Sequence, residues 1–323
     1  MFSSSRNPVD SRAAMLDPAQ VDRRERWFVE GAAALRRTLT TIGLPNLLPP
    51  TGEFYACPCC LIPYGRDALN ARVLTEEHVP PRALGGRELA LTCATCNNTA
   101  GSAFDAHAER REAIDDFYAG GGPNRAMRAE FAVGNVLTRG NIHRAGDALL
   151  LVGEPKANDP KLMEEMTRTL NAWATGEATG ARIGFRPTEN MSVTRARLSW
   201  VRAAYVAAFA VLGWRYVLMS CLNPLRAQLA DPTASLLPPL GMVDLAASRD
   251  RRQLFIVQEP EELRSIAVIL GRYTVLLPWV EDPQPFEALS NALAQYSELP
   301  RPRPQLTGKH VPWPPEPLYA LDR

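Results

Sequence analysis

The first part of the chain has apolar residues at helical spacing. Within residues 17–43, Trp27, Phe28 and Leu35 share one face of a helix, and Gly43 is a residue that commonly follows a helix end. Residues 71–79 then have the character of a strand, which Pro80 and Pro81 end. This pattern predicts a long amphipathic helix followed, after an irregular stretch, by a hairpin.

Residues 129–296 alternate between strand-like and helix-like segments. The stretch 200–222 is the most apolar and predicts a buried helix, and the long helix is expected over about residues 193–216. The expected strands are AEFAVGNVL, DALLLVG, ARIGF, LFIVQ, SIAVILG and YTVLLPWV, and the other expected helices are KLMEEMTRTLNAWA and FEALSNALAQY. We therefore predict an α+β domain with a mostly antiparallel sheet.

Segments rich in Pro and Gly mark the expected domain boundaries. LPNLLPPTG places one boundary near Pro50, and GGGP at residues 120–123 places another. The closing stretch ELPRPRPQLTGKHVPWPPEPLYA has seven prolines and predicts an extended arm, either disordered or lying on a partner. The expected parts are a disordered N-terminus (1–17), a helix with its linker (18–50), a small module (51–118), the α+β domain (119–298) and the Pro-rich arm (299–323).

Composition describes a globular protein without a strong overall charge. Its 323 residues, of which 46% are hydrophobic, suffice for a sizeable core, and the formal net charge is +1. The N-terminus lacks an apolar leader, and Arg202 and Arg215 interrupt the most apolar helix, so we expect a cytoplasmic protein outside any membrane. A nucleic-acid partner would have to be bound by a local basic patch.

Five of the six cysteines fall within a 40-residue window. They supply two Cys-x-x-Cys pairs, Cys57 with Cys60 and Cys93 with Cys96. Two such pairs can present four thiolates tetrahedrally to one Zn²⁺, so we predict a structural zinc that holds the small module together. Cys59 could replace Cys60 as a ligand. Cys221, alone in the apolar helix, is expected to be a small buried side chain.

The 32 residues between the two cysteine pairs hold the remaining candidate chemistry. His78 would lie at the mouth of a hairpin with the loop PRALGG, and Asn97 would lie in the first turn of the helix that follows Cys96. Glu77, His78 and Asn97 would then converge. Carboxylate and amide oxygens suit Mg²⁺, and a neutral imidazole can deprotonate water, so these groups suit phosphodiester hydrolysis.

The strings TEEHVPPRALGG and LTCATCNNTAGSAFD together resemble the zinc-stapled HNH endonucleases of the ββα-metal superfamily, and a bacterial subfamily with Glu-His and Cys-x-x-Cys-Asn-Asn. The resemblance covers about residues 55–107. It implies that His78 is the general base and that Glu77 and Asn97 hold a catalytic Mg²⁺ or Mn²⁺. It also implies that the structural zinc has four ligands: Cys57, Cys60, Cys93 and Cys96.

Two positions depart from the family pattern. Glu77 stands where many HNH enzymes have Asp, and Glu88 falls near the middle Asn that usually orients the histidine. We therefore expect the orienting hydrogen bond to come from another residue. Asp105 follows Asn97 by eight residues on the expected helix, so both would share one face. Asp105 is then either a further ligand of the catalytic metal through water or a solvated carboxylate.

The small module has an unfavourable charge for binding DNA. Residues 51–115 contain six arginines and nine carboxylates, a net charge of −3. Such a module repels phosphates unless metal ions and local basic residues offset it. Arg82 and Arg87, in the hairpin loop, are the candidate phosphate contacts. The expected partner is nucleic acid, DNA in preference to RNA, and the sequence is also compatible with a homo-oligomer.

The leading hypothesis is a metal-dependent HNH endonuclease that hydrolyses phosphodiester bonds in DNA, in restriction, phage defence or a mobile element. The alternative is a zinc-stabilised module that binds nucleic acid or protein and carries an inactive nuclease site. A third hypothesis, a redox-active cysteine protein, predicts no zinc and a reactive thiol at Cys59. His107, His143 and His310 are expected to be ordinary surface or loop residues.

Overall fold

Helices and antiparallel sheets make up the structure, which confirms the α+β prediction. The computed structural model describes residues 17–119, 126–145, 148–177, 179, 183–188, 190–296 and 305–323. The predicted disordered N-terminus, apart from its last residue, lies outside the described residues. No helix in the described ranges combines the length and the apolar character that a membrane span requires.

The first helix, α1 (Pro18–Thr41), is the predicted amphipathic helix. The Asp17 side chain caps it by accepting a hydrogen bond from the backbone N–H of Ala19, at 3.1 Å. Phe28, on its buried face, packs beside Tyr55 of the next segment, with ring centroids 6.1 Å apart. The helix therefore shares a core with the small module.

Residues 51–118 fold into two short hairpins and an interrupted helix. The first hairpin pairs β1 (Tyr55–Ala56) with β2 (Pro63–Tyr64), and the second pairs β3 (Leu74–Val79) with β4 (Arg87–Cys93). The helices are α2 (Asp67–Asn70), α3 (Ala94–Ala100) and α4 (Ala106–Tyr118). The predicted strand over 71–79 begins only at Leu74, because α2 and a left-handed Arg72 (φ 56°) precede it. A hairpin followed by a helix is the order that the sequence predicts.

The long apolar helix ends earlier than predicted. Helix α6 (Val193–Leu212) stops at Gly213, which has a φ of 92°, and α7 (Trp214–Val217) begins after it. A Cβ atom at residue 213 would collide with the carboxylate of Asp322, so this close approach requires glycine. Helix α8 (Asn223–Ala230) follows a short turn that contains Cys221, which is half-buried and lies outside the apolar helix where it was expected.

Residues 126–188 form a separate lobe with its own sheet and core. The strands lie in the order β7-β6-β5-β8, all antiparallel, and α5 (Pro160–Ala174) connects β7 to β8. Side chains from α5 and from the end of α4 cover one face of this sheet. The strands are β5 (Ala126–Val133), β6 (Val136–Ala145), β7 (Ala148–Gly153) and β8 (Ile183–Pro187).

The remaining strands form a second antiparallel sheet in the order β13-β10-β11-β12-β9. One side of this sheet contributes to the main core, and the other packs against α9 (Phe286–Gln295). The range 119–298, predicted as one α+β domain, thus contains two sheets with separate cores. The strands are β9 (Gly241–Val243), β10 (Arg252–Glu259), β11 (Ile266–Leu270), β12 (Tyr273–Leu277) and β13 (Thr307–Val311).

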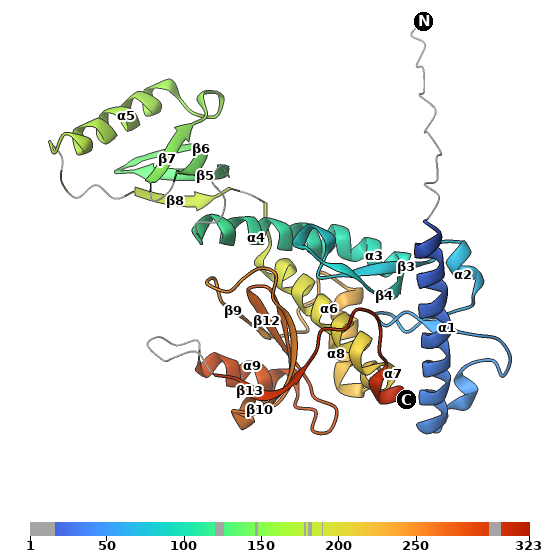
Figure 1. The fold of residues 1–323 in the computed structure, drawn as a ribbon. Coiled ribbons are helices and arrows are strands. Elements are labelled where there is room, and N and C mark those ends of the chain that lie inside the picture. The colour runs from blue at the N-terminus through green and yellow to red at the C-terminus, as the bar shows by residue number, and fades with distance from the viewer. Residues whose placement is uncertain are drawn as a thin grey trace, which may run out of the picture.

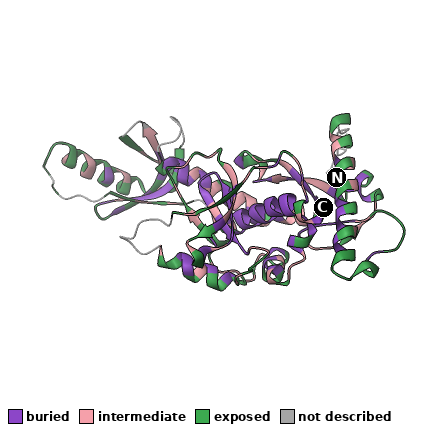
Figure 2. Ribbon diagram, turned by 60° about the horizontal axis from the view of Figure 1, so that its bottom comes forward, coloured by how far each residue is buried: buried purple, intermediate pink, exposed green. Residues whose placement is uncertain are grey.

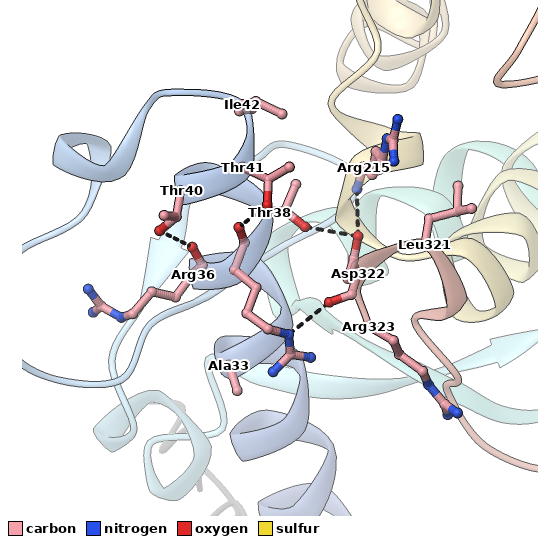
Figure 3. A pocket seen from close by; sticks show the side chains of 11 residues that line it. Ala33, Arg36, Thr38, Thr40, Thr41, Ile42, Arg215, Leu321, Asp322 and Arg323 are labelled. Carbon is pink, nitrogen blue, oxygen red and sulfur yellow. Dashed lines mark hydrogen bonds between the residues drawn. The ribbon is translucent and has the colours of Figure 1, made fainter.

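The C-terminal segment packs on the protein's own body, which corrects the prediction of a disordered or partner-bound arm for its described part, 305–323. Strand β13 pairs with β10, and Tyr319 is buried beside Phe209 of α6. The Asp322 carboxylate accepts hydrogen bonds from Thr38 of α1, at 2.9 Å (Figure 3), and from the backbone N–H of Trp214, at 2.6 Å. The prolines favour an extended conformation. The segment nevertheless packs against the rest of the protein, because its aromatic and acidic residues Tyr319 and Asp322 are buried there.

One hydrophobic core joins α1, the small module, α6 and the second sheet. Helix α6 lies at its centre and is buried over most of its length (Figure 2). The lobe of β5–β8 and α5 stands at the end of the molecule away from α1 (Figure 1). The small module therefore depends on its neighbours for packing and is not an independent unit.

Buried charges fasten α4 to the second sheet. Arg272 donates hydrogen bonds to Asp116, at 2.6 Å, and to Glu112, at 3.1 Å, and Arg249 donates to Asp116 at 2.7 Å. Burial, opposed by the nearby Arg249 and Arg272, raises the pKa of Glu112. This network fixes the helix that continues from the candidate site.

Candidate metal and catalytic site

Four cysteines of the small module meet at one point. Cys57 and Cys60 lie in the turn between β1 and β2, Cys93 ends β4, and Cys96 lies in the first turn of α3. Their Sγ atoms all lie within 4.8 Å of one another. The Sγ atoms of Cys60 and Cys93 are 3.8 Å apart, too far for a disulfide and close to the edge, roughly 3.8 Å, of a tetrahedron with Zn–S bonds of about 2.3 Å.

Backbone groups around these thiols favour the thiolate form. The Cys93 N–H points to the Cys57 sulfur at 3.3 Å, and the Cys96 N–H points to the Cys93 sulfur at 3.4 Å. Hydrogen bonding with Cys57 lowers the pKa of Cys93, whereas Cys57 raises the pKa of Cys96. Four crowded thiols cannot all ionise without a cation, so this donor set fits one metal ion.

Cys60, and not Cys59, completes the cluster, which decides an alternative that the sequence left open. Cys59 is buried outside it, 5% exposed, and lies near Arg202 and Tyr205 of α6. Burial raises the pKa of Cys221. Among the described residues, the four cysteines form the one group of His, Cys, Asp and Glu side chains close enough together to hold a metal.

His78 lies on the solvent side of the β3–β4 hairpin. Its side chain is 28% exposed, and its Nε2 atom is 3.2 Å from Oε1 of Glu88 on β4. A β-bulge leaves Leu89 without a partner on β3, so that His78 pairs directly with Glu88. Glu88, which stands near the family's middle Asn, is thus itself the carboxylate that lies beside the imidazole. A neutral ring that is protonated at Nε2, the nitrogen nearer Glu88, has Nδ1 as its acceptor.

The start of α1 covers the same side of the hairpin. Arg23 donates to Glu76 at 2.6 Å and lies 3.8 Å from Glu88, and Gln20 donates to Glu76 at 2.8 Å. Partial burial acts to raise the pKa of Glu88, but a backbone hydrogen bond, His78 and Arg23 outweigh it, so this pKa lies below its ordinary value. Sequence reasoning did not include Glu76 or Arg23 in the site, because their meeting depends on how α1 docks.

Glu77 points into the protein, on the opposite side of β3 from His78. Its carboxylate is 3% exposed and accepts two hydrogen bonds from Arg202 of α6, each at 2.5 Å, and one from Thr92, at 2.9 Å. Burial disfavours the charge on Arg202, but Glu77 outweighs it and raises the pKa of Arg202. A guanidinium thus occupies the position that a Glu77-bound metal would need. The sequence shows Arg202 only as an interruption in an apolar helix.

Asn97 and Asp105 bond to different elements. The Asn97 amide nitrogen donates to Thr75 Oγ1 at 3.1 Å and to the Glu76 carbonyl at 3.3 Å. Asp105 instead accepts a hydrogen bond from Ser199 of α6, at 2.6 Å. Between them, residues Gly101–Asp105 form a π-helical turn, so the segment is not the one regular helix that the sequence predicts. Burial raises the pKa of Asp105, with Ser199 and Arg202 acting against it.

A Mg²⁺ held jointly by Glu77 and Asn97 does not fit these side chains as they lie. The carboxylate of Glu77 is neutralised by Arg202 within the core, and the hydrogen bonds of Asn97 hold it against β3. Asp105 also faces α6. The catalytic-metal assignment that the resemblance implies therefore stays a prediction without support from this geometry.

The other predicted residues lie at the surface or in strands. Arg82 and Arg87 are both exposed, and the charge of Arg82 reaches Glu88. His107 is half-buried, and its Nδ1 accepts a hydrogen bond from the Ser192 N–H at 3.1 Å. His143 and His310 lie in β6 and β13 and not in loops.

No protein-family model matches this chain, and neither a curated protein nor a solved structure matches it.

Proposed function

We propose that the protein is an HNH-type endonuclease that hydrolyses phosphodiester bonds in DNA, with His78 as the general base and Glu88 as its positioning residue. The observation that carries the proposal is the partly exposed His78 ring, whose Nε2 lies 3.2 Å from the Glu88 carboxylate on a hairpin joined to a helix by four thiols. A histidine whose second nitrogen is held by a carboxylate can accept a proton from water in a fixed orientation. The proposed staple metal is Zn²⁺, since four thiolates in tetrahedral spacing suit it best.

The proposed reaction assigns two tasks to this chain. Nδ1 of His78 takes a proton from the attacking water, and the Glu88 carboxylate stabilises the imidazolium that forms. Arg82 and Arg87, exposed beside the hairpin, contact the phosphates on either side of the scissile bond in this proposal. Family members use a divalent ion to stabilise the developing phosphorane charge. The proposed steps do not involve such an ion, because Glu77 forms a buried ion pair with Arg202.

A second candidate function is a zinc-stabilised module that binds nucleic acid without cutting it. The ion pair between Glu77 and Arg202 favours this function, because it removes the acidic ligand on which related metal sites depend. Under this second proposal the His78–Glu88 pair only stabilises the hairpin.

Nicking of a supercoiled plasmid separates the two functions. The nuclease proposal expects nicking in the presence of Mg²⁺ or Mn²⁺ that falls at least ~100-fold in His78→Ala, the usual contribution of a general base. His107→Ala is the matched control, because it removes a half-buried histidine elsewhere on the module. Equal zinc content and equal melting temperature must accompany the loss. DNA binding without nicking by the wild type would favour the second function.

A further inference from the structure

Among the residues that the structure describes, no helix covers one face of the sheet in the β5–β8 lobe. Met127, Phe131 and Ile142 point to the other face, where α5 and the end of α4 bury them. Successive residues of a strand alternate between the two faces, so the intervening residues define what we term the outer face. It carries Arg128, Glu130, Ala132, Leu137, Arg139, Asn141, His143, Leu150, Val152, Gly184 and Arg186.

Register places the charged residues of the outer face in one row. Glu130 of β5 pairs with Arg139 of β6 on one side and with Arg186 of β8 on the other. Arg139 lies 3.0 Å from the Glu130 carboxylate, and Arg186 also forms an ion pair with it. The guanidinium side chains remain 66% and 79% exposed, whereas Glu130 is 10% exposed. Hydrogen bonds from Arg186 and Arg139 lower the pKa of Glu130. A nearly buried carboxylate thus holds two cations in fixed, accessible positions.

Apolar residues flank this row. Leu137 is 57% exposed, Leu150 is 59% exposed and Val152 is 43% exposed, although each belongs to a regular strand. Arg128 is exposed in the neighbouring row beside Asn141. Three arginines against one carboxylate make the face positive. Large exposed aliphatic groups between fixed cations are typical of an interaction surface.

The outer face supplies what the catalytic module lacks. The module has a net charge of −3, and Arg82 and Arg87 are the exposed arginines of its β3–β4 hairpin. A cavity of about 590 Å³ beside α1 is also lined by arginines, but Arg36 and Arg37 donate to backbone carbonyls. Figure 3 shows that the guanidinium groups around that cavity point in different directions. Binding of a polyanion therefore fits the outer face better than the cavity.

We propose that the outer face of the β5–β8 sheet docks double-stranded DNA and supplies most of the enzyme's affinity for it. β-Sheet proteins bind DNA by placing strands in a groove, and in the major groove Arg and Asn read guanine and adenine edges and aliphatic groups contact thymine methyls. Arg139 and Arg186 bind phosphates or guanines, and Glu130 orients them. The choice of DNA as the polyanion rests on the proposed nuclease function.

The test measures binding of a fluorescein-labelled duplex by anisotropy, in His78→Ala protein so that cleavage does not interfere. Arg139→Gln with Arg186→Gln should weaken binding about 10- to 100-fold, and should reduce the slope of log K against log salt by about 1.8, for two lost phosphate contacts. The matched control is Arg26→Gln with Arg264→Gln, since both are exposed arginines paired with a carboxylate elsewhere. The control should bind as the parent does.

A second variant guards against local unfolding. Arg128→Glu leaves the Glu130 row intact and should also weaken binding, with an unchanged melting temperature. The proposal is overturned if the parent does not bind the duplex, or if both outer-face variants bind as tightly as the control. A change from dimer to monomer in Leu137→Lys with Leu150→Lys, seen by sedimentation, would also overturn it by assigning the face to a second copy of the chain.

Nicking assays keep this inference distinct from the proposed function. With His78 intact, Arg139→Gln with Arg186→Gln should raise KM for plasmid and leave kcat unchanged. If duplex binding depends on the outer face but the wild type does not nick DNA, the docking proposal is supported and the nuclease proposal is refuted. Nicking by the wild type, together with an unaltered KM in the Arg139→Gln and Arg186→Gln variant, would support the nuclease and refute the docking face.

Discussion

Two neighbouring residues of β3 have opposite roles because a strand sends them to opposite sides. His78 faces solvent beside Glu88, and Glu77 is enclosed with Arg202. The Glu-His dipeptide that resembles a catalytic pair is therefore divided in space. One side chain is available for chemistry, and the other joins the hairpin to α6.

Replacing Glu77 should destabilise the protein. In Glu77→Gln the guanidinium of Arg202 loses its buried counter-charge, at a cost of about 3–5 kcal/mol in the free energy of unfolding. Glu77→Met combined with Arg202→Met should recover most of this loss, because it removes both charges. Urea denaturation measures both effects. A Glu77→Gln protein that is as stable as the wild type yet fails to nick DNA would instead make Glu77 a metal ligand.

Glu88 should give the wild type a pH-dependent advantage over Glu88→Gln. Its pKa in the folded protein lies below the ordinary 4.5, so the folded state binds fewer protons than the unfolded state. The contribution is present above the unfolded pKa and is lost as pH falls through the folded pKa. The difference in free energy of unfolding between the two proteins should be greatest above about pH 5 and shrink toward about pH 3. A difference that grows on acidification would contradict this assignment.

At the scale of elements, the four cysteines join the first hairpin, the end of β4 and the start of α3. Cys93 is one of the four clustered thiols and is also the N-cap of α3, because its sulfur accepts a hydrogen bond from the Cys96 N–H. The strand end and the helix start are thereby fixed at one sulfur atom. This places Asn97 against β3, where its amide bonds Thr75.

Metal content should separate Cys60 from Cys59. Cys60→Ser and Cys93→Ser should lose the bound zinc and melt at a lower temperature, because each removes one of four thiolates. Cys59→Ser and Cys221→Ser should retain one zinc per chain. Elemental analysis of the purified proteins gives the stoichiometry. Loss of zinc from Cys59→Ser and its retention in Cys60→Ser would reverse the assignment.

The C-terminal segment should contribute measurably to stability through Asp322. Asp322→Ala removes the acceptor for Thr38 and for the first N–H groups of α7, which should cost about 2 kcal/mol. Asp322→Asn should cost less: it keeps one acceptor, and burial already raises the pKa of the native carboxyl. Chemical denaturation of the two variants measures the difference. Equal stability of Asp322→Ala and wild type would mean that the segment is not held by this contact.

Sequence periodicity predicted elements well where local pattern decides them. The helices α1 and α9, the β3–β4 hairpin and the cysteine pairs follow from spacing and turn residues. It failed where distant residues decide. Gly213 breaks the apolar helix where Asp322 approaches it. Glu77 is buried against Arg202, which lies 125 residues away in the sequence. The π-helical turn at Gly101–Asp105 has no signal in the spacing of residues by which it could have been predicted.

At the scale of the whole molecule, α6 connects all the principal parts. It contacts the hairpin through Arg202, the π-helical turn between α3 and α4 through Ser199, and the second sheet through Trp200, which stacks on Tyr273 with centroids 4.1 Å apart. The lobe with the outer face attaches through the end of α4. In the proposed enzyme, the catalytic hairpin and the DNA-docking sheet are thus held on one scaffold.

The most direct measurement is a double-mutant cycle on plasmid nicking at saturating divalent metal, with wild type, His78→Ala, Glu88→Gln and the double variant. Because the proposal has Glu88 act only by positioning His78, Glu88→Gln should slow the wild type about tenfold or more and have no effect in the His78→Ala background. All four proteins must carry one zinc and melt cooperatively. Equal nicking rates for all four, or equal slowing by Glu88→Gln with and without His78, would contradict a base formed by this pair.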